Sequence, residues 1–398
     1  MKLLPCLAAL LLTLTGCKET LSIPTDCAVE CATGMIIRDT VIDALVDGDS
    51  SFSGYLGFNE APSLLLSNDP AIGIIHSILT FDVTPDSLEF GGTKFRVDID
   101  SVKILVAIGT RDTLVSHPRL LFYRLPIRTD STASFEDIES YFTPDRLIDS
   151  LILSDSVFSG EVSLLFAGED LAKIAIPAVD SGRVSLGIKL HADTLTALRI
   201  GSRLTSGFAP GYVTYGTGEA GAPEVIKIQF DPEALYTGMV RSTASQGTPG
   251  PDLLSVGGTP ASRGIVRFRL PETLRSQGNV LRATLILTPD EPIRGWALER
   301  TGLEVRPVVA DLGYRSPPSS VAIGGALLTP GSSAEVEVDV AGVVNLWFQS
   351  PLIAQMFYLT VTTEGAAFSS PVFRSTRSSS GRPRLRLTYV LPGRPETP

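Results

Sequence analysis

The sequence predicts an all-β protein with two tandem antiparallel β-sandwich domains, jelly-roll-like in layout, which follow an N-terminal signal peptide. Short runs of Val, Ile, Leu, Thr and Phe alternate with polar residues between clusters of Gly, Pro, Ser and Asp, while helical periodicity is scarce. A series of strand patterns also recurs in the same order in both halves of the chain, which indicates two related domains. A closed barrel is the alternative architecture.

Residues 1–16 have the layout of a signal peptide. Lys2 supplies a positive charge, and an apolar stretch runs from Leu3 to Leu14. This stretch is shorter than the roughly 20 apolar residues that a membrane-spanning helix needs. We therefore expect export of the chain rather than a permanent transmembrane helix.

The four residues LTGC, at positions 14–17, resemble the bacterial lipobox. The resemblance implies that the Cys17 thiol becomes a thioether to diacylglycerol, that residues 17–34 form a tether, and that the protein is a membrane-anchored lipoprotein of the cell envelope. Two or three acyl chains anchor a protein stably, whereas one binds reversibly. Lys18 in place of Asp favours the outer membrane by resemblance to enterobacterial sorting. An ordinary secretory signal with an incidental cysteine is the alternative.

The sequence has four cysteines, of which Cys6 leaves with the signal peptide and Cys17 carries lipid. Cys27 and Cys31 remain in an oxidising compartment, where we expect them to form a disulfide. A metal site and two free thiols are the alternatives, although two thiols without a nearby His leave zinc under-coordinated. The net charge is -10 and no basic cluster is present, so nucleic acid is not an expected partner.

The strands show the period-two pattern of half-buried sheet. In residues 262–274, Val266, Phe268 and Leu270 face one way while Arg267 and Arg269 face the other. The same alternation in residues 334–340 and 382–389 predicts a further set of inward side chains, which are Val336, Val338, Val340, Leu385, Leu387 and Tyr389.

Self-similar segments divide the chain. Residues 76–88 follow the plan of 263–274, 97–108 parallel 278–287, and 222–230 parallel 382–390, with one extra residue in the first closing strand. Helix-like spacing of Phe135, Ile138 and Phe142 predicts a helical insertion. We expect a first sandwich domain at 35–231 with its insertion at about 128–155, a second at 232–393 with a helical turn at 340–347, and a tail at 394–398.

The second copy resembles the DNRLRE domain, which is related to carbohydrate-binding module family 96. The residues that carry the resemblance are RGIVRFRLPETL (263–274), VLRATLIL (280–287), AEVEVDVAGVVNLW (334–347), FYLTV (357–361) and RPRLRLTY (382–389). The resemblance covers most of the second copy and implies a non-catalytic β-sandwich that in some relatives binds acidic polysaccharide. It implies no specific ligand residue, because the matching motifs are strands and turns.

No catalytic motif is present. His76, His117 and His191 are far apart in sequence, and the chain has no HExxH, GxSxG, GxxxxGK or GxGxxG pattern. We expect no enzyme activity. We place His76 at the edge of a core strand, and His117 and His191 in exposed turns.

Exposed aromatic rings are the usual platforms for sugars, so Trp296, Tyr212 and Tyr215 are the candidate ligand-binding residues. Burial in the core is the stronger alternative for Trp296, as it is for most large aromatic residues, and Trp347 is expected in the core. Asp47 and Asp49 are candidate calcium ligands in the sequence Asp-Gly-Asp. No other cofactor is expected.

The combined expectation is a lipid-anchored envelope protein whose β-sandwich modules bind a glycan or mediate adhesion. The first alternative is a structural or assembly protein that binds another envelope protein. The second alternative is an enzyme that cleaves polysaccharide with carboxylates alone.

Overall fold

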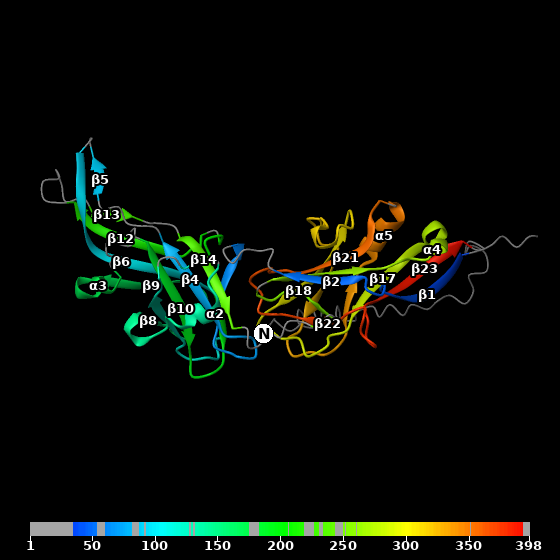
Figure 1. The fold of residues 1–398 in the computed structure, drawn as a ribbon, viewed down its shortest axis with the longest axis horizontal. Helices are drawn as coiled ribbons and strands as arrows, with labels where there is room; N and C mark the ends of the chain where they lie inside the picture. Colours follow the sequence, from blue (N-terminus) through cyan, green and yellow to red (C-terminus); the bar gives the residue numbers. More distant parts are fainter. Residues whose placement is uncertain are drawn as a thin grey trace, which may run out of the picture.

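The computed structural model describes residues 35–53, 60–81, 87–90, 93–126, 129, 132–174, 183–205, 207–218, 227–230, 234–242, 250, 252–259, 261–350 and 352–392. Antiparallel strands dominate, and Figure 1 shows them gathered into two lobes along the long axis of the molecule. The all-β prediction is confirmed. We call the lobe built on residues 60–242 the first lobe, and the lobe built on residues 35–53 and 252–392 the second lobe.

The second lobe has two main sheets. In the described part of the chain, the five-stranded sheet runs in the order β19 (Gly324–Leu328), β18 (Thr301–Val308), β21 (Ala354–Val361), β16 (Ser262–Arg267) and β2 (Asp49–Ser53). The four-stranded sheet runs in the order β1 (Met35–Asp43), β23 (Arg384–Pro392), β17 (Asn279–Leu287) and β20 (Val336–Asp339). A two-stranded sheet pairs β15 (Leu253–Ser255) with β22 (Val372–Arg374).

The hydrophobic core of the second lobe lies between its two main sheets. Leu285 and Leu385 from the four-stranded sheet share one buried cluster with Leu303 and Leu359 from the five-stranded sheet. All the side chains predicted to point inward from residues 266–270, 336–340 and 382–389 are in this cluster, with Tyr389 partly buried at its margin. Period-two alternation therefore identified the core face of these strands correctly.

The first lobe is a single branched sheet of twelve strands within the described residues. Its main path runs β13 (Lys227–Phe230), β12 (Gly211–Gly218), β6 (Thr93–Arg111), β11 (Ala197–Gly201), β3 (Ser63–Ser67), β4 (Ile75–Phe81), β10 (Val184–His191), β7 (Arg119–Arg124) and β8 (Leu147–Ile152). Three strands branch from it: β14 (Ala234–Arg241) pairs with β4, and β5 (Ser87–Phe90) and β9 (Gly160–Ala167) pair with β6.

Short helices cover parts of both lobes. They are α2 (Phe135–Glu139) and α3 (Leu171–Ile174) in the first lobe, and α4 (Glu272–Gln277) and α5 (Ala341–Gln349) in the second. Helix α2 begins at a capping box in which Ser134 and Asp137 satisfy each other's backbone N–H groups. Within its described residues, the predicted helical insertion is helical only here and in the single turn Pro144–Arg146, and residues 147–152 are strand β8. The expected turn at 340–347 is α5.

The strand pairing crosses the expected boundary between residues 231 and 232. Strand β1 pairs with β23 along its whole length, and β2 pairs with β16, so both N-terminal strands lie in the second lobe. Strand β14, which follows the expected boundary, pairs with β4 in the first lobe. The chain therefore starts in the second lobe, builds the first, and returns.

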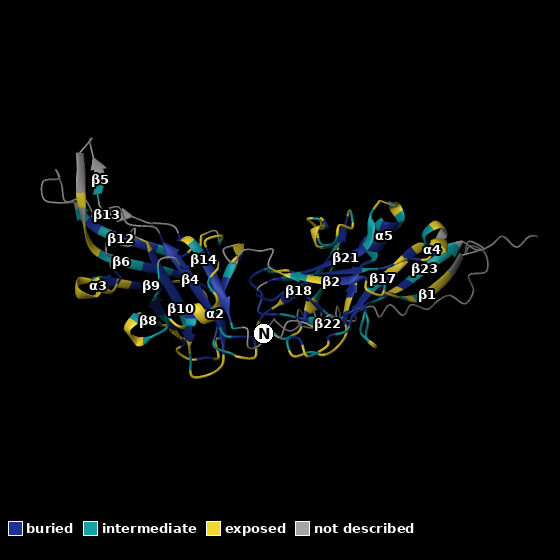
Figure 2. Ribbon diagram, viewed as in Figure 1, coloured by how far each residue is buried: buried dark blue, intermediate teal, exposed yellow. Residues whose placement is uncertain are grey.

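The lobes meet through buried contacts. Trp296 and Phe368, from loops of the second lobe, belong to the hydrophobic cluster of the first lobe. Figure 2 shows buried residues on both sides of the junction between the lobes. Arg199 of β11 forms an ion pair with Glu299 of the second lobe, and the Glu299 side chain is only 1% exposed.

Candidate functional site

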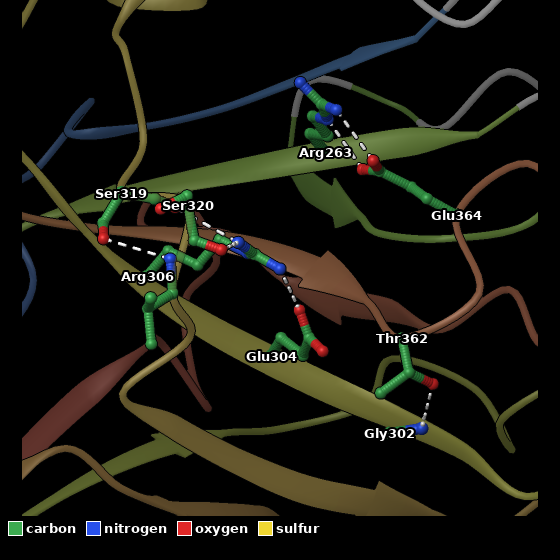
Figure 3. Close-up of polar contacts among 9 residues, drawn as sticks. Arg263, Gly302, Glu304, Arg306, Ser319, Ser320, Thr362 and Glu364 are labelled. Atoms are coloured by element: carbon green, nitrogen blue, oxygen red, sulfur yellow. Dashed lines mark hydrogen bonds and ion pairs between the residues drawn. The ribbon is translucent and has the colours of Figure 1, made fainter.

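A polar groove lies on the outer face of the five-stranded sheet in the second lobe. Leu303 and Val305 of β18 point into the core. Side chains alternate along a strand, so Glu304 and Arg306 point outward. On β21, Tyr358 and Thr360 face outward for the same reason. Together with Arg263 of β16, and with Ser319, Ser320, Thr362 and Glu364 from loops, these side chains line a cavity of about 300 Å³, which we call the Arg263–Glu364 groove. Figure 3 shows the charged residues, the two serines and Thr362 of this groove.

A bidentate ion pair forms one wall of the groove. Arg263 Nε lies 2.6 Å from Glu364 Oε1, and Arg263 Nη2 lies 2.7 Å from Glu364 Oε2 (Figure 3). Arg263 Nη1 also donates to the Tyr358 hydroxyl at 3.1 Å. Burial raises the pKa of Tyr358 above its ordinary value, although the hydrogen bond from Arg263 opposes that rise. The phenol is therefore a neutral donor that is already held in place.

A second ion pair forms the opposite wall. Arg306 Nη2 lies 2.6 Å from Glu304 Oε2, and Arg306 Nη1 donates to the backbone oxygens of Ser319 at 3.1 Å and Ser320 at 2.5 Å. Figure 3 shows this arginine lying between the strand and the loop that carries the two serines. Arg306 thus fixes the loop over the sheet, and the geometry of the wall is set before any ligand arrives.

Threonine hydroxyls line the groove between the two walls. Thr362 Oγ1 accepts a hydrogen bond from the Gly302 N–H at 3.1 Å. Thr360 is 5% exposed, and its Oγ1 has no hydrogen-bond partner within the described part of the chain. A buried hydroxyl without a partner costs free energy.

The chemistry of the groove suits recognition by hydrogen bonds. Its two arginines and two glutamates give balanced charges, and each carboxylate is held by a guanidinium. Planar ion-paired groups retain further donor and acceptor positions with fixed directions. The lining contains no His or Cys. The arrangement can therefore bind a neutral molecule that has several hydroxyl groups.

The structure places the aromatic candidates away from this groove. Trp296 is 6% exposed, and its ring packs edge-on against Phe368 with the centroids 5.5 Å apart. Tyr212 is 4% exposed and packs on Phe81, and burial raises its pKa. Tyr215, on β12, is half-buried. Because a stacking platform needs an exposed ring face, we do not retain Trp296 and Tyr212 as ligand candidates.

Asp47 and Asp49 are engaged by an arginine. Arg377 Nη1 lies 3.7 Å from Asp47 Oδ1 and 3.5 Å from Asp49 Oδ1, and its Nε lies 3.8 Å from Asp252 Oδ1. Thr376 Oγ1 also donates to Asp49 Oδ1. One oxygen of Asp49 has no hydrogen-bond partner among the described residues, but calcium needs six or more oxygen ligands. The residues do not fit a calcium ion, because the guanidinium holds the position that a cation requires.

Cys17, Cys27 and Cys31 lie outside the described residues, so the expected lipid attachment and disulfide stay predictions. His117 and His191 are exposed as expected, although His191 is the last residue of β10. His76 is the second residue of β4 and is buried. Over the described ranges, none of the helices has the length and apolar character to cross a bilayer.

Sequence reasoning did not identify the groove residues. Glu304 and Arg306 resemble the solvated face of any strand, and Arg263 stands out in the sequence only as part of a strand motif. The groove depends on the turn that carries Glu364 and the loop that carries Ser319, which reach this face only in the folded chain. The sequence pattern contains a weak indication, namely two charged residues at alternate positions on neighbouring strands.

Comparison with known proteins gives no family assignment. No protein-family description and no curated protein matches the chain. Two solved virus structures align over 90% of this chain: T=1 particles derived from infectious bursal virus, at 12% identity over 75% of the viral chain, and the Gx strain of infectious bursal disease virus, at 9% identity over 78%. Both TM-scores are 0.12, so these similarities do not establish a shared fold.

Proposed function

We propose that this protein is a lipid-anchored component of the cell envelope that binds a glycan in the Arg263–Glu364 groove without cleaving it. The observation that supports this function is the combination of two ion-paired walls in one polar cavity. A sugar ring presents neighbouring hydroxyls that can donate and accept at once. Ion-paired Arg and Glu side chains offer matching acceptors and donors.

The balanced charge of the groove favours a neutral sugar. A uronic-acid residue would bring a carboxylate near Glu304 and Glu364, and the arginines that could compensate it are already paired. Breaking either pair to bind an anion would leave a carboxylate without its partner. A neutral polyol needs no such exchange, because it adds hydrogen bonds to groups that stay paired.

Binding to neutral and acidic polysaccharides, measured by affinity gel electrophoresis and on a glycan array with the full-length chain, tests the proposal. We expect retention on a neutral polysaccharide, and about tenfold weaker binding for Glu304→Gln and for Glu364→Gln. Arg282→Gln is the matched control, since Arg282 is exposed on β17 in the other sheet.

Three results would count against this function. Absence of retention on every polysaccharide would remove glycan binding and favour the assembly role. Release of reducing or unsaturated ends would show the polysaccharide-cleaving enzyme instead. Unchanged affinity in both groove variants would move the binding site elsewhere on the molecule. Thermal unfolding of each variant separates loss of binding from loss of fold.

The anchor is tested separately. Metabolic labelling with a palmitate analogue is expected to mark the wild-type chain and not Cys17→Ser. Cell fractionation then locates the labelled chain in the outer or the inner membrane. Equal labelling of both chains would contradict lipid attachment at Cys17, without affecting the proposed groove.

A further inference from the structure

A second cavity, in the first lobe, has a different chemical character. It has a volume of about 280 Å³ and lies where the C-terminal end of β7, the start of β10, the start of β8 and helix α3 meet. Strands β8 and β10 and helix α3 are labelled in Figure 1. Four cationic side chains line the cavity, and they are Arg124, Arg146, Lys173 and Arg183. We call this cavity the basic pocket.

Buried apolar side chains also line the basic pocket. Ile148, Ile174 and Leu186 are 6%, 2% and 0% exposed. The backbone beside them is fixed, since the Leu125 N–H donates to the Ser185 oxygen at 2.9 Å. The pocket is therefore a preformed hollow with a rigid apolar part and a cationic part, which is the general composition of a small-molecule site.

Acidic side chains compensate little of this positive charge. Lys173 pairs with Asp170 at 2.7 Å, and Asp149 acts on it from further away. Arg146 lies over the Tyr141 ring, 5.0 Å from its centroid, and donates to the Arg124 backbone oxygen at 3.5 Å. Arg146 also contributes to the lowered pKa of Asp145, after the hydrogen bonds made by that carboxyl. No carboxylate of the described chain lies within 4.0 Å of a charged nitrogen of Arg124, Arg146 or Arg183.

Such a cluster is unexpected in this chain. The sequence has 43 acidic and 33 basic residues, and the arginines of the second lobe lie mostly in ion pairs. Like charges that face one cavity repel each other and destabilise the folded state. The repulsion disappears when an anion binds among them.

From this geometry we infer that the basic pocket binds the phosphate group of a phosphate monoester. Three arginines that have no carboxylate partner among the described residues match a group that carries close to two negative charges and three terminal acceptor oxygens. A carboxylate offers two oxygens and one charge, so it would leave more of the cluster uncompensated. The apolar side chains accept the organic part next to the phosphate. The volume admits a head group or a small molecule rather than a polymer.

The inference does not depend on the glycan groove, which lies in the other lobe. It is tested by isothermal titration calorimetry of the full-length chain with inorganic phosphate and phenyl phosphate, against phenyl sulfate and benzoate. We expect phenyl phosphate to bind at least tenfold more tightly than phenyl sulfate or benzoate. Flotation with phosphatidylcholine vesicles that contain phosphatidic acid distinguishes a lipid head group from a soluble monoester.

The variants identify the pocket. We expect Arg124→Gln and Arg183→Gln each to weaken the binding of phenyl phosphate about tenfold, because each substitution removes charge-assisted hydrogen bonds. Arg282→Gln removes the same charge from the second lobe and is expected to leave affinity unchanged. Lys173→Gln is a milder variant at the rim that tests the same pocket if either arginine variant unfolds.

Two patterns overturn the inference. Equal affinity for phenyl phosphate, phenyl sulfate and benzoate would indicate general electrostatic attraction. The pocket would not be a phosphate site if all three pocket variants kept the wild-type affinity for phenyl phosphate. The same conclusion would follow if Arg282→Gln lowered that affinity as much as the pocket variants do. If the wild type binds vesicles with phosphatidic acid and the pocket variants do not, the ligand is a lipid head group. If the wild type binds phenyl phosphate but not the vesicles, the ligand is a soluble monoester.

Discussion

His76 is a buried ionisable residue whose neutral form the fold requires. Its side chain is 1% exposed, and its ring lies between Phe135, at 5.1 Å, and Phe142, at 4.7 Å, measured between ring centroids. Its Nε2 lies 2.6 Å from Glu139 Oε2, while Lys189 Nζ lies 2.8 Å from Glu139 Oε1. Burial lowers the pKa of His76 from 6.5 to about 4, because desolvation disfavours the imidazolium more than Glu139 stabilises it.

Stability is expected to fall as the pH drops from 6.5 to about 4. In this window the unfolded chain takes up a proton at His76 and the folded chain does not. The free energy of unfolding therefore decreases by up to about 1.4 kcal/mol per pH unit, or about 3 kcal/mol in all. Urea unfolding between pH 4 and 8 measures this decrease in the free energy of unfolding. His76→Gln is expected to flatten the dependence of stability on pH in the same window.

Other carboxylates also take up protons at the acidic end of this pH range. The test is therefore the difference between the stability profiles of the wild type and of His76→Gln. Burial raises the pKa of Glu139, but the hydrogen bonds from Lys189 and His76 and the charge of Lys189 outweigh it, so the pKa is lowered and its own contribution is lost only below its ordinary pKa. His117→Gln is the control, since that side chain is 68% exposed. Parallel profiles for wild type and His76→Gln would contradict the prediction.

At the scale of elements, the sequence predicted one helix well and another poorly. Residues 340–347 were expected to be helical, and α5 spans Ala341–Gln349 with Trp347 buried in the core. Residues 147–152 have helix-like spacing but form β8, because they pair with β7. Short apolar runs fit either period, and the neighbouring strand decides between them.

Helix α5 packs on the core of the second lobe through Val343, Val344 and Trp347, and Trp347 is the largest of these side chains. Trp347 is 1% exposed, and its ring centroid lies 4.8 Å from that of Phe357 on β21. We expect Trp347→Ala to lower the free energy of unfolding by about 3–5 kcal/mol, as for other buried aromatics. The Trp347 indole N–H has no partner among the described residues, so Trp347→Phe should cost clearly less. Urea unfolding measures both variants, with Gln349→Ala as the control at an exposed position on the same helix. Equal losses of stability in all three variants would show that Trp347 does not hold helix α5 in place.

At the scale of the whole molecule, a buried carboxylate joins the two lobes. Glu299 accepts hydrogen bonds from the Phe368 N–H at 3.0 Å and from the Ser369 N–H and hydroxyl, both at 2.7 Å. Arg199, from the first lobe, pairs with Glu299 and also donates to the Ala366 oxygen at 2.9 Å. The network therefore connects a strand of one lobe to a loop of the other.

Loss of Glu299 is expected to destabilise the chain and uncouple its lobes. Glu299→Ala leaves Arg199 half-buried without its partner, and we expect the free energy of unfolding to fall by about 3–5 kcal/mol. Scanning calorimetry is expected to show one transition for wild type and two for this variant.

The exposed pair of Arg384 and Glu335 provides the comparison. Glu335 is 41% exposed, so Glu335→Ala should change stability by less than about 1 kcal/mol and leave one transition. A single transition at unchanged temperature in Glu299→Ala would show that the network does not couple the lobes.

The sequence by itself determined the all-β class, the inward faces of the strands at 266–270, 336–340 and 382–389, and helix α5. These features follow from local periodicity, because side chains two apart on a strand share a face whatever the strand pairs with. The tertiary structure alone placed β1 and β2 in the second lobe, buried His76 beneath α2, and brought Arg263 to Glu364. Each of these depends on contacts between residues far apart in sequence, which periodicity does not encode.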